Sequence, residues 1–251
     1  MDGSLPTRLR VVWRGGLIVV LLLIHVPLHG LWRLARRSSP WPRRFLRAAA
    51  RAAGVDVKLV GRALTQDVLF VANHLSWLDI LAVAGATGAR FVAKDEVRGW
   101  PLIGWLAGMN DTVFVARTAR GQVHQQAQHL RDALSDGIPV MLFPEGGTGD
   151  GHLVGPFRAS LLAALTPPWP GLRLQPLALD YGAEAPLIAW PDELGTGAET
   201  QRILALPGRR RLTIHALPPI DPAALPDRKA LAGAARDALC LVLGEGHSQP
   251  V

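Results

Sequence analysis

Short apolar runs alternate with helical patterns from about Asp56 onward, and this alternation predicts an α/β fold. Runs such as "VMLF" are continuously apolar, which is typical of strands in a mostly parallel or mixed sheet with helices on both faces. The predicted strands are Val68–Ala72, Arg90–Ala93, Thr112–Ala116, Pro139–Phe143, Leu172–Leu179 and Arg211–Leu217. The predicted helices are Trp77–Gly85, Trp100–Gly108, Gly121–Ser135, Phe157–Leu165 and Arg228–Leu243, and the Pro- and Gly-rich segments 167–171 and 182–197 are expected to be loops.

An apolar segment precedes this pattern. Gly15–Trp32 contains no Lys, Arg, Asp or Glu over 18 residues. As a helix it would be about 27 Å long, close to the lower limit for crossing a bilayer. Pro27 and its histidine neighbours weaken the second half of the predicted helix. The segment lacks a small-residue cleavage site at its end, so we expect it to be retained.

Residues 43–55 predict a basic amphipathic helix, because Arg43, Arg47 and Arg51 fall on one helical stripe. The two segments together fit a pair of helices that dips into one leaflet, and they equally fit a single spanning helix with a basic stop. Either arrangement holds the protein at a membrane as a single-pass or monotopic protein. We therefore divide the chain into a membrane-associated segment, 1–55, and an α/β domain, 56–251.

The net charge of +7 is unevenly distributed. Residues 1–51 contain ten arginines and one acidic residue, whereas the remaining 200 contain 17 basic and 19 acidic side chains. Because the positive charge lies beside the most apolar segment, it indicates an anionic membrane surface as partner and not a nucleic acid. The single cysteine, Cys240, excludes an internal disulfide and fits a reducing compartment.

Polar clusters follow three of the predicted strands. They are "NHLSWLD" after "VLFVA", Arg117 after "TVFVA", and "PEGGTGDG" after "VMLF". In open α/β sheets ligands bind at the carboxyl ends of the strands, so these clusters are expected to form one site.

His74 and Asp79 stand five residues apart and would not face each other in a continuous helix. If the chain turns at Leu75–Ser76 and then starts a helix, with Ser76 as its N-cap, the carboxylate can reach the imidazole. It would then fix the tautomer and leave the other ring nitrogen as a general base. The alternative is a histidine at a strand end and an aspartate favoured by the helix dipole, with no chemistry between them.

The motifs together resemble those of the glycerolipid acyltransferases, the family of the 1-acylglycerol-3-phosphate acyltransferases. "NHLSWLD" is similar to the family's N-H-x4-D motif, and "FVAR" resembles its F-x-x-R element at Phe114 and Arg117. "FPEGGTG" resembles the F-P-E-G-T block, and "PFRASL" and "LQPLALDYG" resemble elements further along. These blocks keep the family's order over about Val68–Gly182.

The resemblance implies transfer of a fatty acyl group from acyl-CoA or acyl carrier protein to the free hydroxyl of a lysolipid. His74 would be the general base, Asp79 would orient it, and Arg117 would hold the phosphate of the acceptor. Further substrate-binding residues are expected at Lys94, Glu145, Gly146, Gly147, Thr148 and Arg158, with supporting roles for Asn73, Phe114 and Pro144. No metal is expected, and no cofactor apart from the thioester co-substrate.

One position departs from the family pattern, since Gly147 stands where Thr or Ser usually follows E-G. The first expectation for the acceptor is 1-acylglycerol-3-phosphate, which would give phosphatidate, with the active site on the cytoplasmic side of the membrane. The departure and the "TGDG" run make lyso-ornithine lipid an alternative acceptor. A membrane lipid-binding protein without turnover is the alternative from a different functional class.

Overall fold

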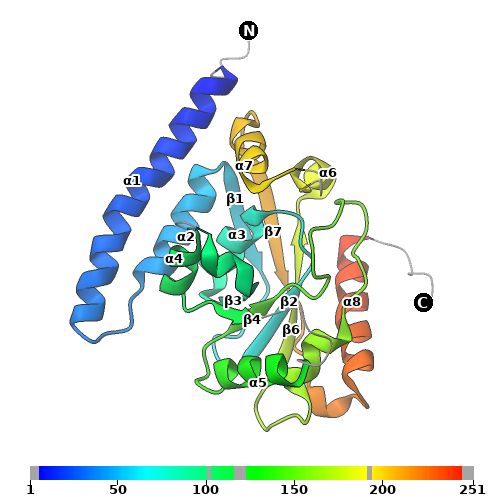
Figure 1. The fold of residues 1–251 in the computed structure, drawn as a ribbon. Coiled ribbons are helices and arrows are strands. Elements are labelled where there is room, and N and C mark those ends of the chain that lie inside the picture. Colours follow the sequence, from blue (N-terminus) through cyan, green and yellow to red (C-terminus); the bar gives the residue numbers. More distant parts are fainter. Residues whose placement is uncertain (1–5, 101–102, 116–122, 191–193, 245–251) are drawn as a thin grey trace.

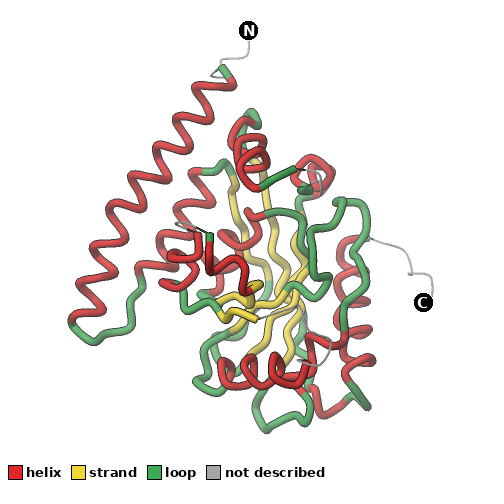
Figure 2. Tube along the Cα trace, in the orientation of Figure 1, coloured by secondary structure: helices red, strands yellow, loops and turns green. Residues whose placement is uncertain are grey.

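The computed structural model describes residues 6–100, 103–115, 123–190 and 194–244. Within them, seven strands form one sheet in the order β1-β7-β6-β2-β5-β3-β4 (Figures 1 and 2). Neighbouring strands are parallel except β6 and β7, which are antiparallel. The strands are β1 (Val55–Val60), β2 (Val68–Ala72), β3 (Arg90–Lys94), β4 (Val113–Val115), β5 (Val140–Leu142), β6 (Arg173–Asp180) and β7 (Arg210–Ala216). The predicted α/β class with a mixed sheet is confirmed.

The strand directions bring the carboxyl ends of β2 to β6 to one edge of the sheet. Because β7 runs antiparallel to β6, its first residues lie at the same edge, where Thr213 pairs with Asp180. The polar clusters that the sequence places after β2 and β5 therefore meet at this edge, as expected for an open α/β sheet.

Helices cover both faces of the sheet, and each face has its own apolar core. One core joins α3 to Phe70, Phe91 and Met141, and the other joins α5 and α8 to Leu69 and Val140. Figure 1 shows α2 and α8 on opposite sides of the sheet. The helices are α1 (Thr7–Leu34), α2 (Trp41–Ala52), α3 (Trp77–Thr87), α4 (Ile103–Met109), α5 (Val123–Leu134), α6 (Ala185–Ile188), α7 (Thr196–Ala205) and α8 (Arg228–Leu243).

Three predictions of secondary structure need correction. The sequence did not predict strand β1, an edge strand that is buried at Val55 and exposed at its far end. The predicted α-helix at Phe157–Leu165 is a 3₁₀-helix over Ala159–Leu165. The segment 182–197, expected to be a loop, contains a 3₁₀ turn, helix α6 and the start of α7. Short elements at edges and ends carry too few residues for a clear period, so their patterns are weak.

Helix α2 belongs to the core of the domain. It ends before residue 55, the predicted limit, because Gly54 adopts a left-handed φ of 98° and strand β1 begins at the next residue. Its apolar face, with Phe45 and Ala49, is buried, and it packs on α3. The approach is close, because a Cβ built on Gly85 of α3 would lie 2.7 Å from the backbone of Arg47. Protein therefore covers the face that one of the two alternatives placed in a leaflet.

Helix α1 lies on the outer side of α2 and continues unbroken through Pro27, although the sequence predicted a weak second half (Figure 1). Near its N-terminus, Val11 and Ile18 pack against the core cluster of α3, and Arg14 donates to carbonyls at the end of α7. Near its C-terminus, Trp32 packs edge-on against Trp41 of α2. The helix is thus attached to the domain near both ends.

Candidate functional site

The chain turns sharply between the end of β2 and the start of α3, as the sequence predicts. Ser76 is the N-cap of α3 and its side chain accepts from the N–H of Leu78. Asp79 is the third residue of the helix, and its carboxylate accepts from the N–H of Ser76 at 2.9 Å, which completes a capping box. The capping requirements of α3 therefore aim the carboxylate back at the turn.

This geometry brings His74 and Asp79 together. The Nδ1 atom of His74 lies 3.0 Å from Oδ2 of Asp79, and that oxygen also accepts from the N–H of Leu75 at 2.7 Å. The side chain of Asp79 has no exposed surface, whereas that of His74 is 16% exposed. The carboxylate fixes the tautomer in which Nδ1 carries the proton, so Nε2 is the nitrogen left to accept one.

An aromatic ring holds the imidazole from one side. Phe143, at the end of β5, stacks on His74 with ring centroids 3.8 Å apart and planes 10° from parallel. Together with the bond to Asp79, this stack limits rotation of the histidine about its side-chain bonds. The site therefore presents Nε2 in one orientation, as a positioned base requires.

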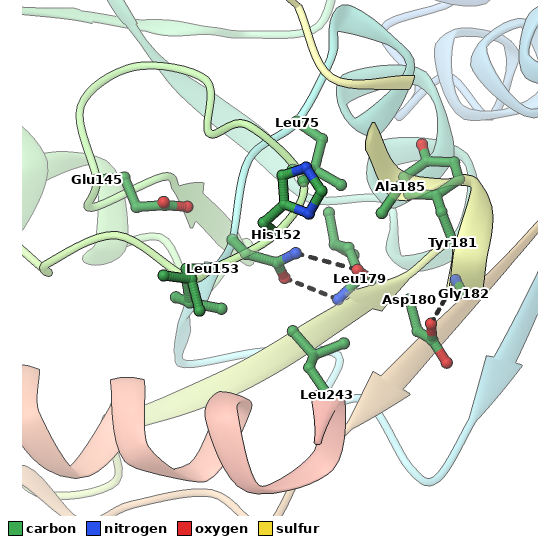
Figure 3. Close-up of a pocket in the computed structure, with 13 residues that line it drawn as sticks. Leu75, Glu145, His152, Leu153, Leu179, Asp180, Tyr181, Gly182, Ala185 and Leu243 are labelled. Atoms are coloured by element: carbon green, nitrogen blue, oxygen red, sulfur yellow. Dashed lines mark hydrogen bonds between the residues drawn. The ribbon is translucent and has the colours of Figure 1, made fainter. Parts of the chain in front are cut away.

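Asn73 ties the turn between β2 and α3 to the neighbouring strand β6. Its side-chain amide donates to the carbonyl of Leu179 at 3.0 Å, and its side-chain oxygen accepts from the N–H of Leu179 at 2.9 Å. These bonds, drawn in Figure 3, extend the pairing of β2 with β6 by one residue. Asn73 thus links the ends of β2 and β6, and its expected role in supporting the base stays a prediction.

Glu145 bridges the turn and the loop after β5. One carboxylate oxygen accepts from the N–H of His74 at 2.8 Å and the other from the N–H of Gly155 at 2.8 Å. Burial raises the pKa of this carboxyl above its usual value, although both backbone donors act to lower it. Since both oxygens already accept hydrogen bonds, Glu145 holds the loop against His74; its binding of substrate stays a prediction.

The loop after Glu145 closes against the turn through small residues. The N–H of Gly149 donates to the carbonyl of His74 at 2.7 Å, and the hydroxyl of Thr148 lies 3.2 Å from the carbonyl of Trp190. Gly146 has a left-handed φ of 85°, and a Cβ there would lie 2.9 Å from the guanidinium of Arg158. Arg158 is exposed, so its guanidinium lies beside the loop at the surface.

The remaining predicted site residues are placed as follows. Pro144 lies in the loop between β5 and Glu145, and its carbonyl accepts from the N–H of Arg158. Phe114 lies in β4, with the guanidinium of Arg98 over its ring at 4.7 Å. Lys94 is the last residue of β3, which pairs with β4 and β5. Arg117 lies outside the described residues.

A cavity of about 150 Å³ lies beside the turn between β2 and α3. It is bounded by Asn73 and Leu75 of the turn, by His152 of the loop and by Leu243 of α8 (Figure 3). Among the described residues, no group of three or more His, Cys, Asp or Glu side chains is arranged to hold a metal ion.

The sequence reasoning gave no site role to Tyr181, which the structure brings into contact with Asp79. Its hydroxyl donates to Oδ1 of Asp79 at 2.8 Å, and its side chain is buried at the carboxyl end of β6. Two signals in the sequence point to it: it is the single tyrosine of the chain, and it stands two residues after the predicted strand Leu172–Leu179. A buried tyrosine usually finds a partner for its hydroxyl.

Comparisons with known proteins identify the family. The sequence model of the family described as Acyltransferase matches residues 54–179. A lyso-ornithine lipid O-acyltransferase of Rhodobacter capsulatus is 32% identical over 96% of this chain and 93% of its own length. A 1-acyl-sn-glycerol-3-phosphate acyltransferase of Neisseria gonorrhoeae is 32% identical over 60% of this chain and 55% of its own length.

The fold has a counterpart among solved structures. The crystal structure of the 1-acyl-sn-glycerophosphate acyltransferase PlsC from Thermotoga maritima superposes with a TM-score of 0.62 at 21% identity. The match covers 83% of this chain and 80% of that one. Together, the family match, the relatives and the shared fold show that the chain belongs to the glycerolipid acyltransferase family and is an O-acyltransferase that acts on lysolipids.

Proposed function

We propose that His74 is the general base of an acyl transfer from a thioester, on coenzyme A or acyl carrier protein, to the free hydroxyl of a lysolipid. The observation that carries this proposal is the contact of 3.0 Å between the imidazole and a fully buried carboxylate. The contact orients the base, stabilises the imidazolium that forms, and leaves Nε2 free for the hydroxyl.

The reaction needs no nucleophile from the protein. Nε2 of His74 removes the proton of the acceptor hydroxyl as its oxygen attacks the thioester carbonyl carbon. The tetrahedral intermediate then collapses, the bond between carbon and sulfur breaks, and the thiolate leaves with the proton carried by the imidazolium. The ester and a free thiol are the products, and His74 returns to its neutral form.

For the acceptor, the structure and the relatives favour lyso-ornithine lipid over 1-acylglycerol-3-phosphate, which the sequence had put first. Gly147 offers no hydroxyl where the family motif carries one, and the hydroxyl of Thr148 is within bonding distance of the carbonyl of Trp190. The planar guanidinium of Arg158 beside Gly146 suits the carboxylate of an ornithine headgroup. The relative from Rhodobacter capsulatus, which is named a lyso-ornithine lipid O-acyltransferase, also matches 96% of the chain.

The phosphate-bearing acceptor remains a second candidate for a specific reason. The chain keeps the F-x-x-R element that ends at Arg117, and a guanidinium binds phosphate as well as carboxylate. The relative from Neisseria gonorrhoeae, named for this acceptor, matches 60% of the chain.

A panel of acceptors tests the proposal directly. Purified protein would be given lyso-ornithine lipid, 1-acylglycerol-3-phosphate or lysophosphatidylethanolamine, each with acyl-CoA and with acyl carrier protein as donor. We expect the highest kcat/KM with lyso-ornithine lipid. His74→Ala should lower acyl transfer by about 10²- to 10⁴-fold while the protein stays folded. Activity that survives this change would exclude the mechanism, and acyl transfer only to 1-acylglycerol-3-phosphate would exclude the acceptor.

We also propose that α1 attaches the enzyme to one leaflet, with the active site on the cytoplasmic side. The helix has 28 residues, and its outer surface exposes large apolar side chains such as Leu23 and Ile24. Its other side is occupied by the domain, through Arg14, Ile18 and Trp32. A helix that spanned the bilayer would bring this part of the domain into hydrocarbon, so the contacts favour the monotopic alternative.

A further inference from the structure

Asp79 has two oxygens with separate partners. Oδ2 lies within hydrogen-bond distance of His74 Nδ1 and of the N–H groups of Leu75 and Ser76. Oδ1 faces the opposite way and accepts from the hydroxyl of Tyr181 at 2.8 Å. The carboxylate thus joins the catalytic turn on one side to the end of β6 on the other.

This second contact matters because Asp79 is completely buried. An ionised carboxylate without contact to water needs a donor at each oxygen to remain charged. The hydroxyl of Tyr181 supplies that donor at Oδ1 without adding a charge to the site. Burial, followed by the charge of Asp79, raises the pKa of Tyr181 well above its usual value, so the phenol keeps its proton in the working range.

We propose that Tyr181 is a positioning residue, which keeps Asp79 ionised through Oδ1 and thereby sets the lower pH limit at which His74 acts as a base. This inference rests on the proposed function of His74. Tyr181 acts through Asp79 and takes no part in bond making, so its contribution differs from that of the base itself.

The described titratable groups that face Asp79 come from three elements. His74 is in the turn after β2, Tyr181 follows β6, and Glu145 follows β5. Glu145 acts on Asp79 through charge alone, because its oxygens are bonded to the N–H groups of His74 and Gly155. Among these three, Tyr181 is the neutral donor to the carboxylate.

The first test is Tyr181→Phe, which keeps the ring and removes the hydroxyl. Without its donor at Oδ1, Asp79 takes up a proton more readily, and while ionised it binds an imidazolium more strongly. Both effects move the acidic limb of the kcat/KM profile to higher pH. We expect kcat at neutral pH to fall about tenfold, as for loss of one hydrogen bond to a charged group, with KM little changed.

Thr87→Val is the matched control. Thr87 also has a buried hydroxyl, bonded to the carbonyl of Val83 at the other end of α3, away from Asp79. Both variants remove one buried hydroxyl, so both should lower the unfolding midpoint. We expect only Tyr181→Phe to move the acidic limb. Equal shifts in the two variants, or no shift in either, would overturn the proposal.

A second test uses the fact that the chain has one tyrosine. Biosynthetic replacement of tyrosine by 3-fluorotyrosine changes Tyr181 alone and makes its hydroxyl a stronger donor. The acidic limb should then move to lower pH, opposite to the effect of phenylalanine. A shift in the same direction as Tyr181→Phe would show that disturbed packing is responsible, and would overturn the proposal.

The fluorine also gives a readout that does not depend on turnover. We expect its NMR resonance to shift over the pH range in which His74 gains its proton, and His74→Ala to abolish that shift. If the wild type acylates no lysolipid, the proposed function fails. The fluorine titration would still test whether Tyr181 is coupled to His74 through Asp79. A resonance that behaves identically in the wild type and His74→Ala would refute the contact.

Discussion

The turn that carries the proposed base, residues 73–79, and helix α1 are held to the domain in different ways. In the turn, His74, Asp79 and Asn73 are fixed by short hydrogen bonds to backbone groups and to Tyr181, and little of the site is exposed. Helix α1 has no buried residue, and its outer side chains are exposed apolar groups. The polar groups named in the first region are bonded within the protein, whereas the second leaves apolar surface uncovered, which fits the proposed attachment to a membrane.

The difference assigns separate tasks to the two regions. The proposed base, His74, must be held in one orientation before substrate arrives, and the carboxylate of Asp79, which the capping box of α3 places, does this. A membrane anchor needs area and not a fixed orientation. Changes in the turn should therefore affect turnover, and changes on the outer face of α1 should affect binding to lipid.

The largest expected effect is that of Asp79→Asn. The amide keeps the size of the carboxylate and an acceptor for the N–H groups of Leu75 and Ser76, but it cannot stabilise an imidazolium. We expect the rate of acyl transfer to fall by about 10²- to 10⁴-fold. The protein should stay folded, with only a modest fall in its unfolding midpoint. Steady-state kinetics and thermal unfolding of the same preparations measure both.

The control for this change is Asp227→Asn. Asp227 is the N-cap of α8 and accepts from the N–H groups of Lys229 and Ala230, so its carboxylate also bonds two backbone donors at a helix start, but it has no histidine partner among its described contacts. It should lose a little stability and keep its activity. If Asp79→Asn were as active as Asp227→Asn, the carboxylate would be a helix cap and nothing more.

Much of the turn could be predicted from the sequence, because its parts are local. The strand Val68–Ala72, the N-cap Ser76 and the reach of Asp79 back to His74 all depend on residues within twelve positions of one another. Tyr181 lies 102 positions from Asp79, and a single sequence does not tell which strand end lies next to β2. The same reason explains why the bond of Glu145 to the N–H of His74 was not predicted.

The N-terminal helices show the opposite limit of sequence reasoning. The apolar face of α2 reads equally well as a surface for lipid or for protein, since both bury hydrocarbon. Only the position of α3, with Gly85 against Arg47, decides that protein covers it. For α1 the pattern predicted a membrane helix, but the bonds of Arg14 to the carbonyls of Leu204 and Leu206 depend on residues about 190 positions away.

An effect of intermediate size is expected from the double change Leu23→Asp and Ile24→Asp on α1. These side chains are 67% and 50% exposed. Burying each in lipid contributes about 1.5–3 kcal/mol, so losing both should weaken binding to vesicles by 100-fold or more, by this order-of-magnitude estimate. Co-sedimentation with anionic vesicles measures the binding, and activity on lysolipid in detergent should be retained.

The matched control changes an equally apolar and exposed pair elsewhere. Leu241→Asp and Val242→Asp alter α8, where these side chains are 77% and 41% exposed. Vesicle binding should be unaffected there, because α8 covers the face of the sheet opposite to α2. Equal losses in the two double variants would show that α1 is not the attachment surface.

The smallest expected effect concerns Glu145, whose carboxylate bonds both the turn at His74 and the loop at Gly155. Burial raises the pKa of its carboxyl, so the folded protein binds the proton more tightly than the unfolded chain does. Stability then falls as the pH rises from about 4.5, the ordinary value, through the higher value of the folded state. Glu145→Gln cannot ionise and should lack this decline, although its amide can accept only one of the two N–H bonds. Denaturant unfolding of both proteins between pH 4 and 8 measures this effect. As the pH rises, the free energy of unfolding of the wild type should fall relative to that of Glu145→Gln. A relative rise would mean that the two backbone donors outweigh burial.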